Sequence, residues 1–214
     1  MNKISENTYQ ILLSDTKGHE PFFYSIFNLL NDRLPGSYIV SVNKEPLAIN
    51  FFSKSVKPLS YYCKKRLVDY YMAINIIRDL YNQHIFVSKY GYGFYYIDLD
   101  DIIVIDNSIF LYINSQVVKE FRNGQLMFFS PFNRTAQHAF YAPEILVLQS
   151  IPAKLSHKCF YYSLGALAIY CLFGAKLVNS DASLLLKPIS QTKLYWLILK
   201  LVDPDCERRS ALII

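Results

Sequence analysis

A run without any charged residue, from Cys159 to Ala175, constrains the fold of this chain more than any other feature. Lys158 and Lys176 bound the run, and its length lies at the lower limit of what crosses a bilayer. A helix that is apolar on every side fits either the centre of a globular protein or a membrane. Tyr, Ser and Gly inside the run weaken insertion, so we expect a buried helix. A membrane-associated protein anchored by 159–175 stays open as an alternative.

Composition agrees with a folded domain that has a substantial core. Of the 214 residues, 52% are apolar and 18% are charged, which excludes a disordered chain. The net charge of +5 specifies neither nucleic acid nor membrane as a partner. Lys64, Lys65 and Arg66 form a basic cluster, but no nucleic-acid motif accompanies it. We therefore interpret the cluster as a solvated helix face and expect no nucleic-acid partner.

The cysteines and the first residues bear on the compartment. Cys63, Cys159, Cys171 and Cys206 show no C-x-x-C spacing and no metal-ligand spacing with histidine. Isolated thiols of this kind predict reduced, structural cysteines and an intracellular, cytoplasmic setting. The segment MNKISENTYQ contains no apolar run, which predicts no signal peptide.

Periodicity predicts one long amphipathic helix, one clear hairpin and several later helices. Apolar residues recur at helical spacing over 59–81, Leu67 among them, and apolar strands flank the turn Asp106–Ser108. Residues 1–55 are otherwise irregular, and 116–135 is polar and predicts a loop. The expected helices are 21–30, 59–81, 143–149, 159–173 and 192–202; the expected strands are 38–42, 46–52, 85–87, 94–99, 102–105 and 109–113.

Several landmarks in this order resemble the C-terminal lobe of protein kinases. They are the helix end Ile77-Arg78-Asp79-Leu80-Tyr81-Asn82-Gln83-His84, the hairpin 102–113, Tyr141-Ala142-Pro143-Glu144, Tyr162-Ser163-Leu164-Gly165 with its exit at Gly174, and Leu201-Val202-Asp203-Pro204 before Glu207-Arg208-Arg209-Ser210. Each motif is weak alone, and their joint order over 58–214 carries the resemblance. It implies an α+β, mainly α fold: a kinase-like helical C-lobe (58–214) with a short β-hairpin, and a reduced N-terminal lobe (1–57). It also implies a structural ion pair between Glu144 and Arg209.

The residues that a kinase needs for phosphoryl transfer are largely missing. Gly18 and Gly36 are the only glycines before residue 58, so the glycine-rich phosphate loop is absent, and no strand lysine is recognisable. Aligned on the hairpin, the family's magnesium-binding asparagine corresponds to Asp101 and its catalytic aspartate to Tyr96. Tyrosine cannot accept the substrate proton at neutral pH, because its own pKa is about 10. A second register places Asp98 on the catalytic aspartate, with a loop two residues short.

The metal-binding and supporting positions differ from the family as well. Asn114-Ser115-Gln116 stands where the family carries Asp-Phe-Gly, and Phe160 replaces the aspartate that begins the central helix. These differences predict that no metal is bound. Two interpretations of Asp98, Asp100, Asp101 and Asp106 stay open: a cluster that binds a cation, or solvated turn carboxylates.

The leading hypothesis is therefore a catalytically inactive kinase-like protein, a pseudokinase, that binds or scaffolds a protein partner and needs no cofactor. The alternative is a divergent active serine/threonine kinase that uses ATP and Mg²⁺, with Asp98 as base and Asp101 or Asp106 as metal ligand. The Asn-, Ile-, Lys-, Tyr- and Phe-rich usage is typical of AT-rich genomes, and 192–196 resembles kinase-like proteins of large DNA viruses. This resemblance implies the host cytoplasm or the virion as the location.

Overall fold

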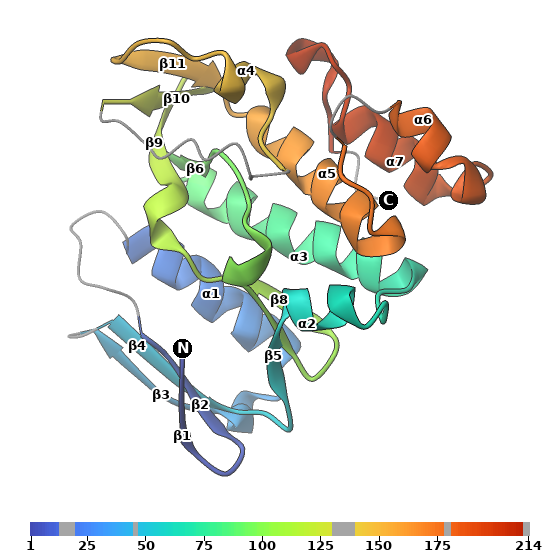
Figure 1. Cartoon of the computed structure of the whole chain (residues 1–214). Helices are drawn as coiled ribbons and strands as arrows, with labels where there is room; N and C mark the ends of the chain where they lie inside the picture. Colours follow the sequence, from blue (N-terminus) through green and yellow to red (C-terminus); the bar gives the residue numbers. More distant parts are fainter. Residues whose placement is uncertain (13–19, 45–46, 130–139, 178–180, 212–214) are drawn as a thin grey trace.

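The computed structural model describes residues 1–12, 20–44, 47–129, 140–177 and 181–211. It is a mixed α/β structure, 46% helical and 25% strand, and its strands form three antiparallel sheets. Helices α3 and α5 pack against each other in the middle of the molecule, with two sheets and α1 on one side and α7 on the other (Figure 1). The structure contains more strands than the sequence predicts, and the additional strands are short.

The first sheet combines strands from the N-terminal segment in the order β1-β2-β4-β3. Its strands are β1 (Asn2–Ser5), β2 (Thr8–Leu12), β3 (Ile39–Lys44) and β4 (Leu47–Phe52). Helix α1 (Glu20–Arg33) lies between β2 and β3 in the chain and packs on α3 and on strand β8. The helix and the strands β3 and β4 were predicted within a few residues, whereas the description of the remainder as irregular missed β1 and β2.

The long helix predicted over 59–81 is wrong, because the chain forms two helices there. Helix α2 (Leu59–Lys64) ends before Arg66, whose φ of +53° lies in the left-handed region. Helix α3 (Tyr70–Ser88) begins where the Asp69 side chain accepts a hydrogen bond from the Met72 amide at 2.8 Å. This cap starts α3 as a helix separate from α2. Leu67, counted on the apolar face, is 50% exposed in the connection, and the strand predicted at 85–87 is the last turn of α3.

The hairpin predicted over 102–113 is confirmed. Strands β7 (Ile102–Ile105) and β8 (Ile109–Tyr112) are buried along their whole length, and β5 (Val56–Pro58) pairs with the other edge of β7. Asp106 and Asn107 adopt φ values of +48° and +60° at the turn. Short polar residues of this type tolerate the left-handed conformation that a tight hairpin needs.

A third sheet has the order β11-β10-β9-β6 and corrects two further predictions. Its strands are β6 (Tyr92–Phe94), β9 (Val118–Arg122), β10 (Gln125–Phe128) and β11 (Ala153–Ser156). The strand predicted over 94–99 therefore ends at Phe94, and part of the loop predicted over 116–135 is the hairpin β9–β10. Asn123 and Gly124 form its turn with positive φ values. Such an Asn-Gly pair is a hairpin signature that the polar composition concealed.

Helix α5 (Cys159–Phe173) is the buried centre that the charge-free run predicts. It packs on α3 and α7 and ends at Gly174, whose φ of +68° suits a glycine cap. The other late helices are α4 (Pro143–Leu146), α6 (Ala182–Leu185) and α7 (Lys193–Leu201). Helix α4 stops three residues earlier than predicted, and α7 begins after Thr192, whose side chain caps it. Among the described residues, no helix combines the length and the apolar character that a membrane span requires.

Candidate functional site

The loop between β6 and β7, residues 95–101, is where the resemblance places the catalytic residues of a kinase. Tyr96 is half-buried there, and its ring lies against Tyr141, with ring centroids 4.7 Å apart. The two side chains also share a hydrogen bond. Burial, and then the nearby carboxylates of Asp98 and Asp101, raise the pKa of the Tyr96 hydroxyl above its ordinary value. The hydroxyl therefore keeps its proton at neutral pH and cannot act as a general base.

Asp98 caps its own turn at the centre of this loop. Its carboxylate accepts a hydrogen bond from the Asp100 amide at 3.1 Å and so begins a short 3₁₀ helix over Leu99–Asp101. The Asp98 side chain is half-buried, whereas Asp100 is exposed. A carboxylate in such a capping position stabilises the loop, whatever further role it has.

Asp101 joins the end of the loop to the end of strand β8. Its carboxylate accepts a hydrogen bond from the Asn114 side-chain amide at 2.6 Å, and its backbone carbonyl accepts one from the Ile113 amide at 3.0 Å. The Asn114 side-chain oxygen in turn accepts a hydrogen bond from the Gln116 amide at 2.9 Å. An aspartate and an asparagine, 13 positions apart in sequence, therefore face each other directly at the edge of the loop.

Asp106 lies away from the other carboxylates. It is at the opposite end of β7 from Asp101, five residues along an extended chain, which corresponds to about 16 Å. Its carboxylate accepts hydrogen bonds from the Ser53 hydroxyl and the Ser55 amide, both at 2.9 Å. Asp101 and Asp106 therefore cannot share one ion. Within the part of the chain that the structure describes, no three His, Cys, Asp or Glu side chains gather as metal ligands.

Glu144 of α4 and Arg209, for which the resemblance implies an ion pair, lie in direct contact. Two guanidinium nitrogens of Arg209 donate to the two carboxylate oxygens of Glu144, at 2.5 and 3.1 Å. The Arg209 Nε donates to the Asp203 carbonyl at 2.8 Å, and a further hydrogen bond goes to the Lys158 carbonyl. Arg209 is 1% exposed and lies over the Tyr162 ring. We call this group of contacts the Arg209 anchor.

Polar residues of α3 attach the β7–β8 hairpin to the helices, a role that the sequence did not reveal. Asp79 is fully buried, accepts hydrogen bonds from Arg33 of α1 at 2.7 Å and from the Phe110 amide at 3.2 Å, and burial raises its pKa. Gln83 bonds both backbone groups of Tyr112, at 2.8 and 3.2 Å. Both side chains lie on the buried face of α3, so only their three-dimensional surroundings show what they bind.

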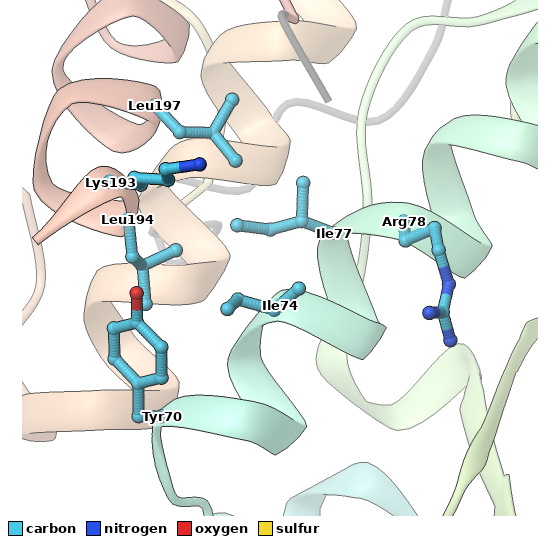
Figure 2. Close-up of a pocket in the computed structure, with 7 residues that line it drawn as sticks. All are labelled: Tyr70, Ile74, Ile77, Arg78, Lys193, Leu194 and Leu197. Carbon is cyan, nitrogen blue, oxygen red and sulfur yellow. The ribbon is translucent and has the colours of Figure 1, made fainter. Parts of the chain in front are cut away.

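A groove of about 210 Å³ lies between α3 and α7, and we call it the α3–α7 groove (Figure 2). Apolar side chains form its walls, and two cationic residues complete the lining. In Figure 2 the Lys193 side chain extends across the groove toward Ile77, whereas the guanidinium of Arg78 points away from it. The lining residues are Tyr70, Ile74, Ile77, Arg78, Lys193, Leu194 and Leu197.

A second hollow, of about 570 Å³, lies on another side of α7 and has the opposite charge. Asp181 and Asp203 are its charged lining residues, together with apolar side chains from α4, α5, α6 and α7. Within the described part of the chain, the lining of the α3–α7 groove contains lysine and arginine and no acidic residue. The two concave surfaces therefore differ in the charge of the ligands that they favour.

Comparison of the chain with protein-family models and with curated protein sequences finds no match. The interpretation of the site therefore depends on its own geometry and on the resemblance of its motifs.

Proposed function

We propose that the chain has a reduced protein-kinase fold and serves as a protein-binding module without phosphotransfer activity. The order of elements supports this proposal. A four-stranded sheet with one helix inserted between its strands precedes two helices, a loop followed by the β7–β8 hairpin, the Ala-Pro-Glu segment of α4, and the buried α5. The ion pair between Glu144 and Arg209, which the resemblance implies, supports the proposal as well.

Among the described residues of β2 and α1, the charged pair that kinases use to hold nucleotide phosphates is absent. In kinases a strand lysine pairs with a glutamate of the helix that follows. The corresponding strand β2 contains no lysine, and the only glutamate of α1 is Glu20 in its first turn. The missing pair agrees with the absence of a glycine-rich loop before residue 58.

The proposal depends mainly on the packing and the raised pKa of Tyr96, in the loop between β6 and β7. A side chain that is packed against Tyr141, and whose pKa lies above its ordinary value, replaces the catalytic aspartate. General-base catalysis would require a group that loses its proton near neutral pH.

One observation favours the active-kinase alternative. Asp101 and Asn114 stand at the family's two magnesium-ligand positions with their residue types exchanged, and their side chains are 2.6 Å apart. An aspartate and an asparagine together offer oxygen ligands of the type that Mg²⁺ prefers. In this alternative Asp98 acts as the base, and ATP and Mg²⁺ are required.

Thermal unfolding with and without ATP and Mg²⁺ separates the two proposals. Ligand at about 100 times its dissociation constant stabilises a folded protein by about 2.7 kcal/mol, which raises the melting temperature measurably. We expect no shift at millimolar nucleotide for the wild-type chain. A magnesium-dependent rise that Asp101→Asn abolishes would contradict the inactive form and support the alternative, and Asp98→Asn should then abolish phosphate transfer.

For the binding function we propose the α3–α7 groove as the site and an acidic, amphipathic peptide segment as its occupant. The apolar walls favour aliphatic or aromatic side chains. Lys193 extends over the groove, and none of the described lining residues is acidic, so an aspartate or glutamate of the peptide finds a complementary charge there.

Selection of a random peptide library on the purified chain tests this assignment. We expect the enriched peptides to combine apolar residues with Asp or Glu, and Lys193→Glu to replace these acidic residues by Lys or Arg. Lys187→Glu makes the same charge change at an exposed position outside the lining and should leave the selected sequences unchanged. If Lys193→Glu leaves the sequences of the enriched peptides unchanged, the groove is excluded as the binding site.

A further inference from the structure

Two of the four cysteines lie in contact, although 108 positions separate them in the sequence. The sulfur atoms of Cys63 and Cys171 are 3.5 Å apart. Cys63 is in the last turn of α2, and Cys171 is near the end of the central helix α5. Isolated positions in the sequence gave no sign of this pair, because only the packing of α2 on α5 brings the two thiols together.

The two thiols differ in a way that gives each a separate role. Cys63 is half-buried, and exposed lysines follow it at positions 64 and 65, whereas Cys171 is buried. The contact with Cys171 lowers the pKa of the Cys63 thiol, and the same contact, together with burial, raises the pKa of Cys171. An accessible thiol with a lowered pKa beside a second thiol is the usual arrangement at redox-sensitive sites.

We propose that Cys63 and Cys171 are a redox site, in which Cys63 reacts with hydrogen peroxide and Cys171 resolves the product as an intramolecular disulfide. The Cys63 thiolate attacks the peroxide, forming an S–O bond as the O–O bond breaks and hydroxide leaves. The Cys171 thiol then attacks the sulfur of the resulting sulfenic acid, and the S–S bond forms as the S–O bond breaks. The departing hydroxide takes up the proton of the Cys171 thiol and leaves as water. The two thiols lose two electrons, and one peroxide becomes two water molecules.

This disulfide would attach the surface helix α2 to the buried helix α5. It would close a long loop of the unfolded chain, and cross-links of this kind stabilise mainly by restricting the unfolded state. The positive cluster at 64–66, which the proposed binding function does not use, directly follows Cys63 in the chain. The inference is independent of whether the chain binds nucleotide or a peptide.

The other two cysteines provide internal controls. Cys206 is also half-buried, but burial raises the pKa of its thiol, so it is expected to react more slowly than Cys63. Cys159 is fully buried, and burial raises its pKa as well. A general loss of thiols would therefore be distinguishable from the reaction proposed for Cys63.

The test is mass spectrometry of the full chain after treatment with hydrogen peroxide and alkylation of the remaining thiols, without reductant. We expect a mass loss of about 2 Da measured before the alkylation step, a linked peptide pair containing Cys63 and Cys171, and a melting temperature raised by about 5 °C. Reduction with dithiothreitol should reverse all three changes.

Variants assign the roles of the two sulfurs. Cys63→Ser should abolish the linked peptide, Cys171→Ser should leave a sulfenic acid at Cys63 that dimedone traps, and Cys206→Ser should change neither result. If Cys171→Ser does not fold, Cys63→Ser at the half-buried position still decides the question. A disulfide between other cysteines, or oxidation of Cys206 before Cys63, would overturn the proposal.

Discussion

The Arg209 anchor and the loop between β6 and β7 are built on opposite principles. At the anchor, a fully buried guanidinium donates to both oxygens of the Glu144 carboxylate and to the backbone carbonyls of Asp203 and Lys158. In the loop, the half-buried Asp98 carboxylate caps its own turn, and the Asp101 carboxylate accepts a hydrogen bond from the neutral side-chain amide of Asn114. A buried ion pair therefore fixes the Arg209 anchor, whereas hydrogen bonds of partly exposed side chains shape the loop and attach it to Asn114 and Tyr141. Substitutions in the two regions should therefore have very different costs.

The largest effect is expected at the anchor itself. Arg209→Ala removes one partner of a buried ion pair and leaves the Glu144 carboxylate without its cation, which should lower the free energy of unfolding by about 3–5 kcal/mol. Urea unfolding followed by circular dichroism measures this loss. Arg208→Ala is the matched control, because its side chain is 74% exposed, and it should change stability by less than about 0.5 kcal/mol. Equal effects of the two variants would remove the basis of the comparison.

The second effect concerns His84, where α3, the strand β6 and α5 meet. Its ring is buried, stacks on Phe160 with centroids 4.3 Å apart, and accepts a hydrogen bond from the Phe94 amide. Burial, and then the nearby His157, lower the pKa of His84 to about 3. Between this pKa and the ordinary value near 6.5, the unfolded chain binds a proton that the folded chain does not, so stability is lost as the pH falls.

Urea unfolding at pH 7 and at pH 4.5 measures this dependence. We expect the wild-type chain to lose about 2 kcal/mol through His84 over this range. His84→Phe keeps an aromatic ring on Phe160 and should flatten the dependence, although it removes the acceptor for the Phe94 amide. The raised pKa of Asp79 acts in the opposite direction, since its contribution falls as the pH rises. An unchanged slope in His84→Phe would show that other groups control the acid response.

A third, smaller effect tests how closely α5 and the end of α7 approach each other. A Cβ atom added at Gly165 of α5 would lie 2.5 Å from a methyl carbon of Val202 and 2.9 Å from the Cβ of Leu201. Gly165→Ala should therefore destabilise the protein by about 1–3 kcal/mol, the range for overpacked cores. Gly36→Ala is the control, because nothing lies within 4 Å of the added atom. Equal melting temperatures for the two variants would contradict the close packing.

The features that the sequence predicts best are those with local signals. The hairpin at Asp106–Ser108 and the charge-free helix α5 follow from turn residues and from composition within a few positions. The break between α2 and α3 depends on the left-handed φ of Arg66 and on the Asp69 cap, and neither residue interrupts the apolar period of the sequence. The pairing of Gly93 with Lys119 in the third sheet is a contact over a long sequence distance, and periodicity contains no information about it.

The candidate site shows the same division between local and distant information. The residue types of Tyr96, Asp98 and Asp101 are visible in the sequence, and so is their order in the loop. Their partners are not: Asn114 and Tyr141 come from separate segments that folding brings to the loop. The contact between Cys63 and Cys171 is another example, because two isolated cysteines in sequence become one pair only through the packing of α2 on α5.

The smallest effect is expected in the loop, at Asp101. Asp101→Asn keeps an oxygen that accepts the hydrogen bond from Asn114 and removes only the charge, so stability should change by less than about 1 kcal/mol. Urea unfolding in the presence of a chelator, and again with Mg²⁺, checks this expectation. Because the proposed inactive form requires no ion at this position, Mg²⁺ should not separate the variant from the wild-type chain. A wild-type chain that Mg²⁺ stabilises, beside an unresponsive Asp101→Asn variant, would show that the loop binds a cation and is not only a local turn.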